Sequence, residues 1–123
     1  MTISECYEKL GGDYADVCTR LPGDRLVVKF IGRFREDDSF DTLCRAMEAG
    51  DRAQAFRAAH TLKGVSGNLG FDRLYDSAAR LTALLRPETD AISNDARLCF
   101  AAVRQDYEQT LCAIRAYLTE PDA

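Results

Sequence analysis

The sequence predicts an all-α protein, an antiparallel up-down four-helix bundle with additional short N-terminal helical segments. Apolar residues recur every three or four positions over most of the chain, and the connections between these periodic stretches are short. No sustained alternating pattern and no Asn-Gly or Asp-Gly hairpin turn indicates a strand. Amphipathic helices joined by short loops bury their apolar stripes best as an antiparallel bundle.

The first third of the chain contains two turn signals. Residues 11–13 and 21–24 are rich in glycine or contain proline, and they end in Asp13 and Asp24, both suited to N-capping. These signals predict short helices before and after Asp13. A longer helix from Asp24 is predicted by the apolar residues Leu26, Val27, Phe30, Ile31 and Phe34.

The middle of the chain predicts two helices with a very short turn between them. Ser39 is expected to cap a helix that Gly50 ends. Asp51 can then cap a helix over residues 51–69, which stops near Gly70.

Two further helices complete the predicted bundle. Asp72 can cap a helix through Leu85 that Pro87 ends, and residues 87–94 form a polar loop. A long final helix is marked by Phe100, Val103, Tyr107, Leu111, Ile114 and Leu118.

The composition indicates one folded domain spanning residues 1–123, with the bundle core at about 24–118. A chain of 123 residues with 46% hydrophobic and 29% charged residues lies outside the disordered range. No apolar stretch approaches the roughly 20 residues needed to cross a bilayer, and the N-terminus lacks the regions of a signal peptide. We therefore expect a cytoplasmic protein without a membrane partner.

The net charge and the cysteine pattern argue against a nucleic-acid-binding, disulfide-bonded or zinc-binding protein. A net charge of -4 and a pI near 5.0 argue against a nucleic-acid binder. The five cysteines are an odd number without a Cys-x-x-Cys pair, which favours reduced thiols in helices over disulfides or a redox motif. A zinc site would need several ligands from distant segments with at most one histidine, so no metal site is expected.

His60 is the only histidine in the chain, and helical geometry places it away from the core. The core stripe of this helix is predicted to contain Ala55, Ala58, Ala59, Leu62, Val65, Ser66 and Leu69. His60 lies about 160° from the centre of that stripe, grouped with Phe56, Lys63, Gly64 and Gly67. An exposed imidazole, largely unprotonated at neutral pH, can act as a nucleophile, base or ligand, although a lone histidine is more often structural.

The two glycines beside His60 favour the functional interpretation. Each costs about 1 kcal/mol relative to alanine inside a helix. Gly64 and Gly67 follow His60 by one and two turns, so they remove side chains from the adjacent surface and admit a bulky partner. The alternative for both is close packing against a neighbouring helix.

Lys63 and Phe56 complete this face. Lys63 can donate hydrogen bonds to anionic oxygens on a group carried by the imidazole, or it is an ordinary solvated lysine. Phe56 is an apolar residue on an outward face, which either the N-terminal segment covers or a partner docks against.

The runs His60-Thr61-Leu62-Lys63-Gly64 and Gly67-Asn68-Leu69-Gly70 closely resemble the signature of histidine-containing phosphotransfer (HPt) domains. The resemblance implies that His60 accepts a phosphoryl group from a receiver-domain aspartyl phosphate and passes it to another receiver aspartate. Lys63 would then be the cation near the phosphoryl group, and Gly64 and Gly67 the small residues that admit the receiver. Many family members carry glutamine or glutamate on the next helix, at a position occupied here by Thr82.

The resemblance also implies the partners and the cofactor. Response-regulator receiver domains or a hybrid histidine kinase would be the partners of a monomeric carrier, and Mg²⁺ would reside on the receiver, with no cofactor on this chain. The chain has no G-x-x-x-x-G-K-[ST] loop, so we expect a phosphocarrier without a nucleotide-binding or kinase site of its own.

Three alternatives to a freestanding relay carrier remain. One is a phosphoacceptor domain of the chemotaxis-kinase type, although such domains normally belong to long chains. Another is a helical adaptor that docks a partner through Phe56 and the glycine face without phosphorylation. A hydrolase is the weakest, since a lone histidine has no evident nucleophile or orienting acid nearby in the sequence.

Overall fold

The structure, a computed structural model, describes residues 1–119, which form helices and connecting turns without a strand. The helices are α1 (Ile3–Leu10), α2 (Tyr14–Arg20), α3 (Asp24–Glu36), α4 (Ser39–Ala49), α5 (Arg52–Asn68), α6 (Asp72–Leu85) and α7 (Asn94–Thr119). The predicted all-α class is therefore confirmed.

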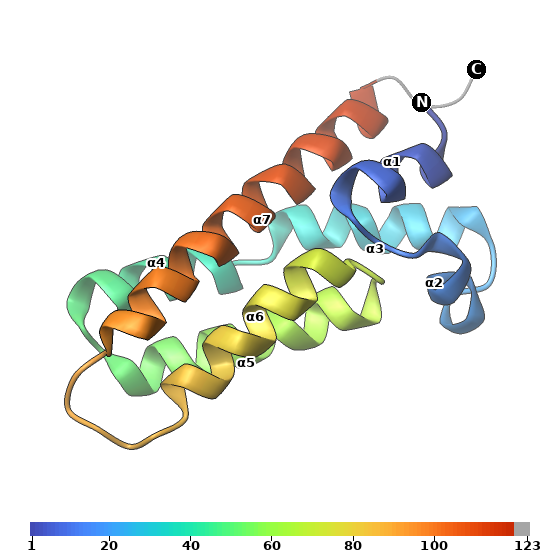
Figure 1. The fold of residues 1–123 in the computed structure, drawn as a ribbon. Helices are drawn as coiled ribbons and strands as arrows, with labels where there is room; N and C mark the ends of the chain where they lie inside the picture. Colours follow the sequence, from blue (N-terminus) through green and yellow to red (C-terminus); the bar gives the residue numbers. More distant parts are fainter. Residues whose placement is uncertain (120–123) are drawn as a thin grey trace.

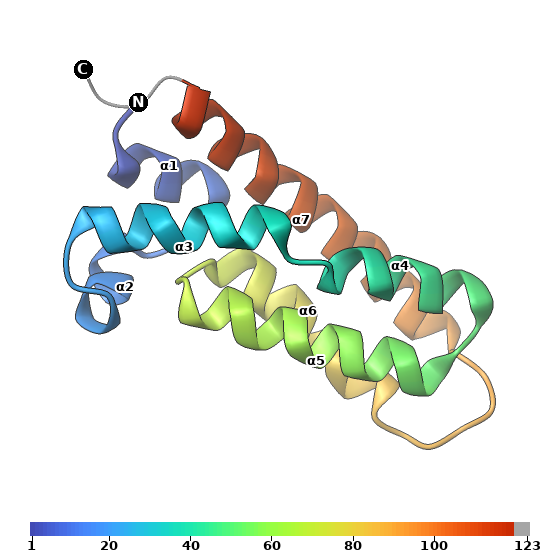
Figure 2. The same ribbon diagram turned by 180° about the vertical axis from the view of Figure 1, so that it is seen from behind.

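Four antiparallel rows of helix make up the bundle (Figures 1 and 2). Helices α3 and α4 run end to end along one row and are separated by a break at Asp37 and Asp38, while α5, α6 and α7 form the other three rows. Phe40 in α4 stacks on Tyr107 in α7, with ring centroids 4.0 Å apart, so the first and last rows of the bundle are in contact. Because α5 and α6 are joined by only three residues, their faces stay in close register over their whole length.

The turn into α5 follows the sequence prediction. Gly50 has φ 70°, a left-handed conformation that favours glycine, and its N–H donates to the carbonyl groups at the end of α4. The Asp51 carboxylate then accepts a hydrogen bond from the backbone N–H of Gln54 at 3.1 Å. This pair sets the direction in which α5 leaves the turn.

Other predicted caps are displaced by one residue. The sequence predicts N-caps at Asp24, Ser39 and Asp72, but each of these is the first helical residue and follows the cap that the structure shows, which is Gly23, Asp38 and Phe71 respectively. An aspartate in the first turn still stabilises a helix, because its charge opposes the positive end of the helix dipole. The prediction of Asp13 as the cap of α2 is confirmed by its bond to the N–H of Asp16.

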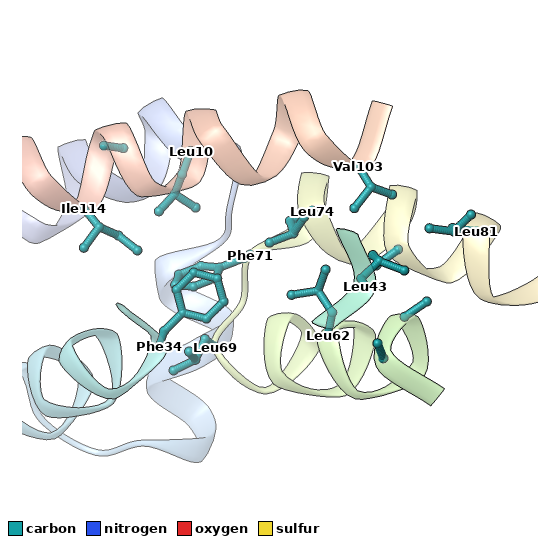
Figure 3. Packing of buried hydrophobic residues seen from close by; sticks show 14 of the residues in the cluster. Leu10, Phe34, Leu43, Leu62, Leu69, Phe71, Leu74, Leu81, Val103 and Ile114 are labelled. Atoms are coloured by element: carbon teal, nitrogen blue, oxygen red, sulfur yellow. The ribbon is translucent and has the colours of Figure 1, made fainter. Parts of the chain in front are cut away.

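The core is centred on Phe71, the last of the three residues that join α5 to α6 (Figure 3). Its ring lies 5.1 Å from that of Phe34 and 5.7 Å from that of Tyr7, centroid to centroid. Large aliphatic side chains from several helices surround these rings, including Leu62, Leu74 and Ile114. Full burial of each such side chain stabilises the fold by roughly 2 kcal/mol.

The N-terminal helices fasten the turn between α5 and α6. The Tyr7 hydroxyl donates to the carbonyl of Leu69 at 2.7 Å, and the backbone N–H of Asp13 donates to the carbonyl of Gly70 at 3.1 Å. This end of α5 lies opposite the α6–α7 loop (Figure 1). The N-terminal segment therefore holds the C-terminal end of the helix that carries His60.

All five cysteines lie in helices, and none is bonded to another. Cys6 is fully buried and its thiol contacts the carbonyl of Ala113, with 3.5 Å between sulfur and oxygen, whereas Cys112 is exposed. Burial raises the pKa of Cys6 to about 11, so its thiol stays protonated and inert at neutral pH.

Candidate functional site

His60 lies on the solvent side of α5. The opposite side of this helix is buried, at Ala55, Ala58, Ala59, Leu62 and Ser66. The one polar side chain in that set, Ser66, donates its hydroxyl proton to the carbonyl of Leu62 at 2.7 Å. The predicted orientation of α5 is confirmed, and it leaves the imidazole exposed.

Phe56 lies next to His60 and connects it to the end of α6. The two rings stack with 6.2 Å between centroids and 14° between planes. The guanidinium carbon of Arg86, the residue after α6, lies 5.7 Å from the centroid of Phe56. Phe56 is half-buried, and the N-terminal segment, which packs at the other end of α5, does not provide its cover.

Arg52 holds the end of α6 beside the start of α5. Its Nη1 donates to the carbonyl of Leu85 at 2.6 Å and its Nε donates to that of Thr89 at 3.2 Å. These bonds keep Arg86 within reach of Phe56. Arg86 carried no signal in the sequence, because an arginine before Pro87 at a helix end looks like an ordinary surface residue.

Gly64 leaves open space one turn after His60. A Cβ atom built on Gly64 meets no neighbouring atom within 4 Å, and the residue is exposed. The half-buried Lys63 lies beside it, also one turn from His60. The surface next to the imidazole is therefore bare on the side of Gly64 and cationic on the side of Lys63.

Gly67 does not leave open space. A Cβ atom there would lie 3.0 Å from Cδ2 and 3.1 Å from Cε2 of Tyr75 in α6. The expectation from the sequence that both glycines clear the surface holds for Gly64 only. For Gly67 the alternative of close packing against a neighbouring helix describes the geometry, because the missing side chain makes room for an aromatic ring.

Thr82 is level with His60 but its hydroxyl proton is used elsewhere. The contacts of Gly67 with Tyr75 and of Phe56 with Arg86 define an antiparallel register in which His60 lies opposite Thr82. Thr82 is buried and its Oγ1 donates to the carbonyl of Ala78 at 2.7 Å, within α6. It therefore has no proton to donate to the imidazole.

The helix that carries His60 is basic within an acidic protein. The chain has a net charge of -4, yet α5 contains no aspartate or glutamate, and its charged residues are Arg52, Arg57 and Lys63. Arg86 adds a further cation at the Phe56 end. This face suits a partner that presents anionic groups.

The site is a surface and not an enclosed pocket. A cavity of about 420 Å³ lies between α2, α3 and the end of α5, but His60 is not among the residues that line it. Residues 1–119 contain no group of three histidine, cysteine or acidic side chains placed to hold a metal ion. Within the same residues, no helix has the length and apolar character that crossing a membrane requires.

Comparison with known protein families matches residues 25–117, roughly three quarters of the chain, to the Hpt domain. Comparisons with curated proteins and with solved structures gave no match. The matched region includes His60 and all of the residues that surround it, from Phe56 to Arg86. The chain, an antiparallel helical bundle with an exposed histidine on α5, therefore belongs to the Hpt domain family.

Proposed function

We propose that this protein is a phosphorelay carrier that accepts a phosphoryl group on His60 from a receiver aspartyl phosphate and passes it to another receiver aspartate. Phosphotransfer in two-component signalling is the role of the Hpt family. The observation that carries the assignment to His60 is its exposure beside the open space at Gly64. A domain that presents an aspartyl phosphate can approach this surface without a side chain in its way.

The main contribution of this chain to the transfer is a positioned nucleophile. The lone pair of one imidazole nitrogen attacks phosphorus, the bond between phosphorus and the aspartate oxygen breaks, and its electron pair stays on the carboxylate. The other ring nitrogen keeps its proton during this step. Such transition states are stabilised by positioning and by cations, and Mg²⁺ held by the receiver's own carboxylates would supply positive charge there.

Lys63 and Arg86 are the cations that this chain contributes. Lys63 is one turn from His60 on the same helix, and Arg86 is held one turn to the other side through Phe56. Both can interact favourably with the negative oxygens of a phosphorylated imidazole. Phe56 also offers apolar surface to the receiver.

The carrier role also accounts for the lack of nucleotide machinery. No phosphate-binding loop of the form G-x-x-x-x-G-K-[ST] occurs in the sequence, so the phosphoryl donor is another protein, either a receiver or a hybrid histidine kinase. We propose that the protein acts without a cofactor of its own, as a monomer in the cytoplasm, where receiver domains would meet it.

Incubation with a phosphorylated cognate receiver tests this function. We expect acid-labile, alkali-stable phosphate on the chain, and its subsequent transfer to a second, unphosphorylated receiver. Phosphorylation by a kinase domain with ATP but by no receiver would indicate the chemotaxis-kinase type instead. Receiver binding without any phosphate transfer would indicate an adaptor and contradict the proposal.

A further inference from the structure

Tyr75 presents an unusually exposed aromatic ring on α6. Its relative exposure is 37%, and the other large apolar side chains in residues 1–119 with comparable or greater exposure are Leu84 and Leu98. Its hydroxyl makes no hydrogen bond to another group within residues 1–119. Both the ring and the hydroxyl are therefore available to a partner.

The ring is held in place by Gly67. A Cβ atom at that position would come within 3.0 Å of the ring, so any other residue would force Tyr75 to move. A glycine inside a helix costs about 1 kcal/mol relative to alanine, and here the cost allows the ring to lie against the backbone of α5. If Tyr75 had no role on this surface, a smaller residue at position 75 would allow alanine at position 67 and remove this cost.

Tyr75 shares a face with the residues around His60. Positions 75, 82 and 86 fall on one side of α6 at helical spacing, and this side runs along α5. Gly67 follows His60 by about 10 Å along the helix axis, and Phe56 precedes it by about 6 Å. The imidazole therefore lies between two aromatic rings, Phe56 at one end and Tyr75 at the other.

This surface is small compared with a protein interface. A specific interface covers about 800 Å² on each partner, which is a patch roughly 30 Å across, whereas Gly67 and the ring of Tyr75 beside it lie about 10 Å from His60 along α5. A receiver footprint centred on His60 is large enough to include the ring of Tyr75. Tyrosine is enriched among the residues that contribute most binding energy at such interfaces, because it combines a large apolar surface with a polar end.

We propose that Tyr75 is a docking residue that helps this protein select its receiver domain, with Gly67 fixing the position of its ring. This inference rests on the proposed phosphotransfer function and adds a contact outside the reacting atoms. The ring binds an apolar side chain of the receiver near the phosphorylated aspartate, and the hydroxyl forms a hydrogen bond to a polar group at the edge of that contact. Because Tyr75 lies beside Gly67, which is about 10 Å from His60 along the axis of α5, its side chain takes no part in the chemistry.

The test compares transfer from a phosphorylated receiver with labelling by phosphoramidate, a small donor that needs no docking. In Tyr75→Ala we expect the ratio of receiver transfer to phosphoramidate labelling to fall about tenfold, mainly through a higher KM for the receiver. Leu98→Ala, which removes a more exposed side chain from α7, is the matched control and should leave the ratio within about twofold. An unchanged ratio in a folded Tyr75→Ala variant would overturn the inference.

A second measurement uses the unmodified side chain, in case Tyr75→Ala does not fold. The NMR signals of the Tyr75 ring, assigned by comparison with Tyr75→Phe, should shift on addition of the receiver. Signals that stay in place while the receiver binds would also overturn the inference. A wild-type protein that accepts no phosphoryl group from any receiver would contradict the proposed function itself, whereas normal transfer that ignores Tyr75 would contradict only the docking role.

Discussion

The guanidinium group of Arg86 lies over the ring of Phe56, with 5.7 Å between its carbon and the ring centroid, and Phe56 in turn stacks with His60. A cation over an aromatic ring at an exposed site is worth about 0.5–1 kcal/mol. The contact therefore holds the guanidinium group at the Phe56 end of the site, although Arg86 and His60 are 26 positions apart in the sequence. Together with Lys63 it places positive charge on both sides of the proposed phosphoacceptor.

The first prediction concerns these two cations. Lys63→Ala and Arg86→Ala should each slow phosphoryl transfer to His60 or shorten the lifetime of phosphorylated His60 by about threefold to tenfold, because a partly exposed charge pair contributes about 1 kcal/mol. The lifetime can be followed after labelling with phosphoramidate. Arg80→Ala, which removes an exposed arginine elsewhere on α6, is the control. If both variants match the wild type in rate and lifetime, neither cation acts on the phosphoryl group.

A second prediction separates stability from function at Gly64. Because a Cβ atom fits there without a contact, Gly64→Ala should raise the free energy of unfolding by about 0.5–1 kcal/mol, as measured by urea denaturation. Gly67→Ala should gain less or lose stability, since the ring of Tyr75 must move. An equal gain at both positions would contradict the packing of the Tyr75 ring against Gly67.

The same position tests access to the imidazole. Gly64→Leu should block transfer from a receiver while the bundle stays folded, because the new side chain projects into the space that the receiver needs. Gly32→Leu in α3 is a matched control, since a Cβ atom at Gly32 also meets nothing within 4 Å. Transfer at the wild-type rate in Gly64→Leu would show that the open surface has no role.

A fourth prediction concerns Thr82. Since its hydroxyl proton is donated to Ala78 within α6, Thr82→Val should leave the rate of transfer within about twofold of wild type. A stopped-flow or quench-flow measurement with a phosphorylated receiver decides this. A loss of tenfold or more would mean that the hydroxyl acts on the imidazole during transfer.

The hydrogen bond from Tyr7 to the turn between α5 and α6 provides a fifth prediction. Tyr7→Phe removes the buried hydrogen bond to Leu69 and should lower the free energy of unfolding by about 1–2 kcal/mol. Burial also raises the pKa of Tyr7 above its usual value and that of Cys6 to about 11. Both groups hold their protons more tightly in the folded chain, so wild-type stability should fall as the pH rises from about 9 to 11, and less so in Tyr7→Phe. A difference between the two proteins that does not depend on pH would contradict this linkage.

Much of the fold and the centre of the site could be predicted from local patterns. The helical period of α5 is enough to place His60 outside the core and to put Gly64 beside it, because both follow from residue spacing on one helix. Gly50 and Asp51 also mark the turn correctly, since capping depends on a few adjacent residues.

Contacts between helices could not be predicted in the same way. The positions of Tyr75 over Gly67 and of Arg86 over Phe56 depend on the register of α6 against α5, which no single helix determines. The attachment of α1 and α2 to the α5–α6 turn likewise depends on tertiary hydrogen bonds such as that of Tyr7. Prediction of Gly67 as open surface failed for this reason.

The most direct test of the account is to locate the phosphoryl group after reaction with a phosphorylated receiver, in the wild-type protein and in His60→Gln. Because His60 is the only histidine, we predict acid-labile phosphate on this residue in the wild type and none on the variant, which should remain folded since the side chain is exposed. Acid-labile phosphate retained in His60→Gln, or found on another residue of the wild type, would contradict the central claim.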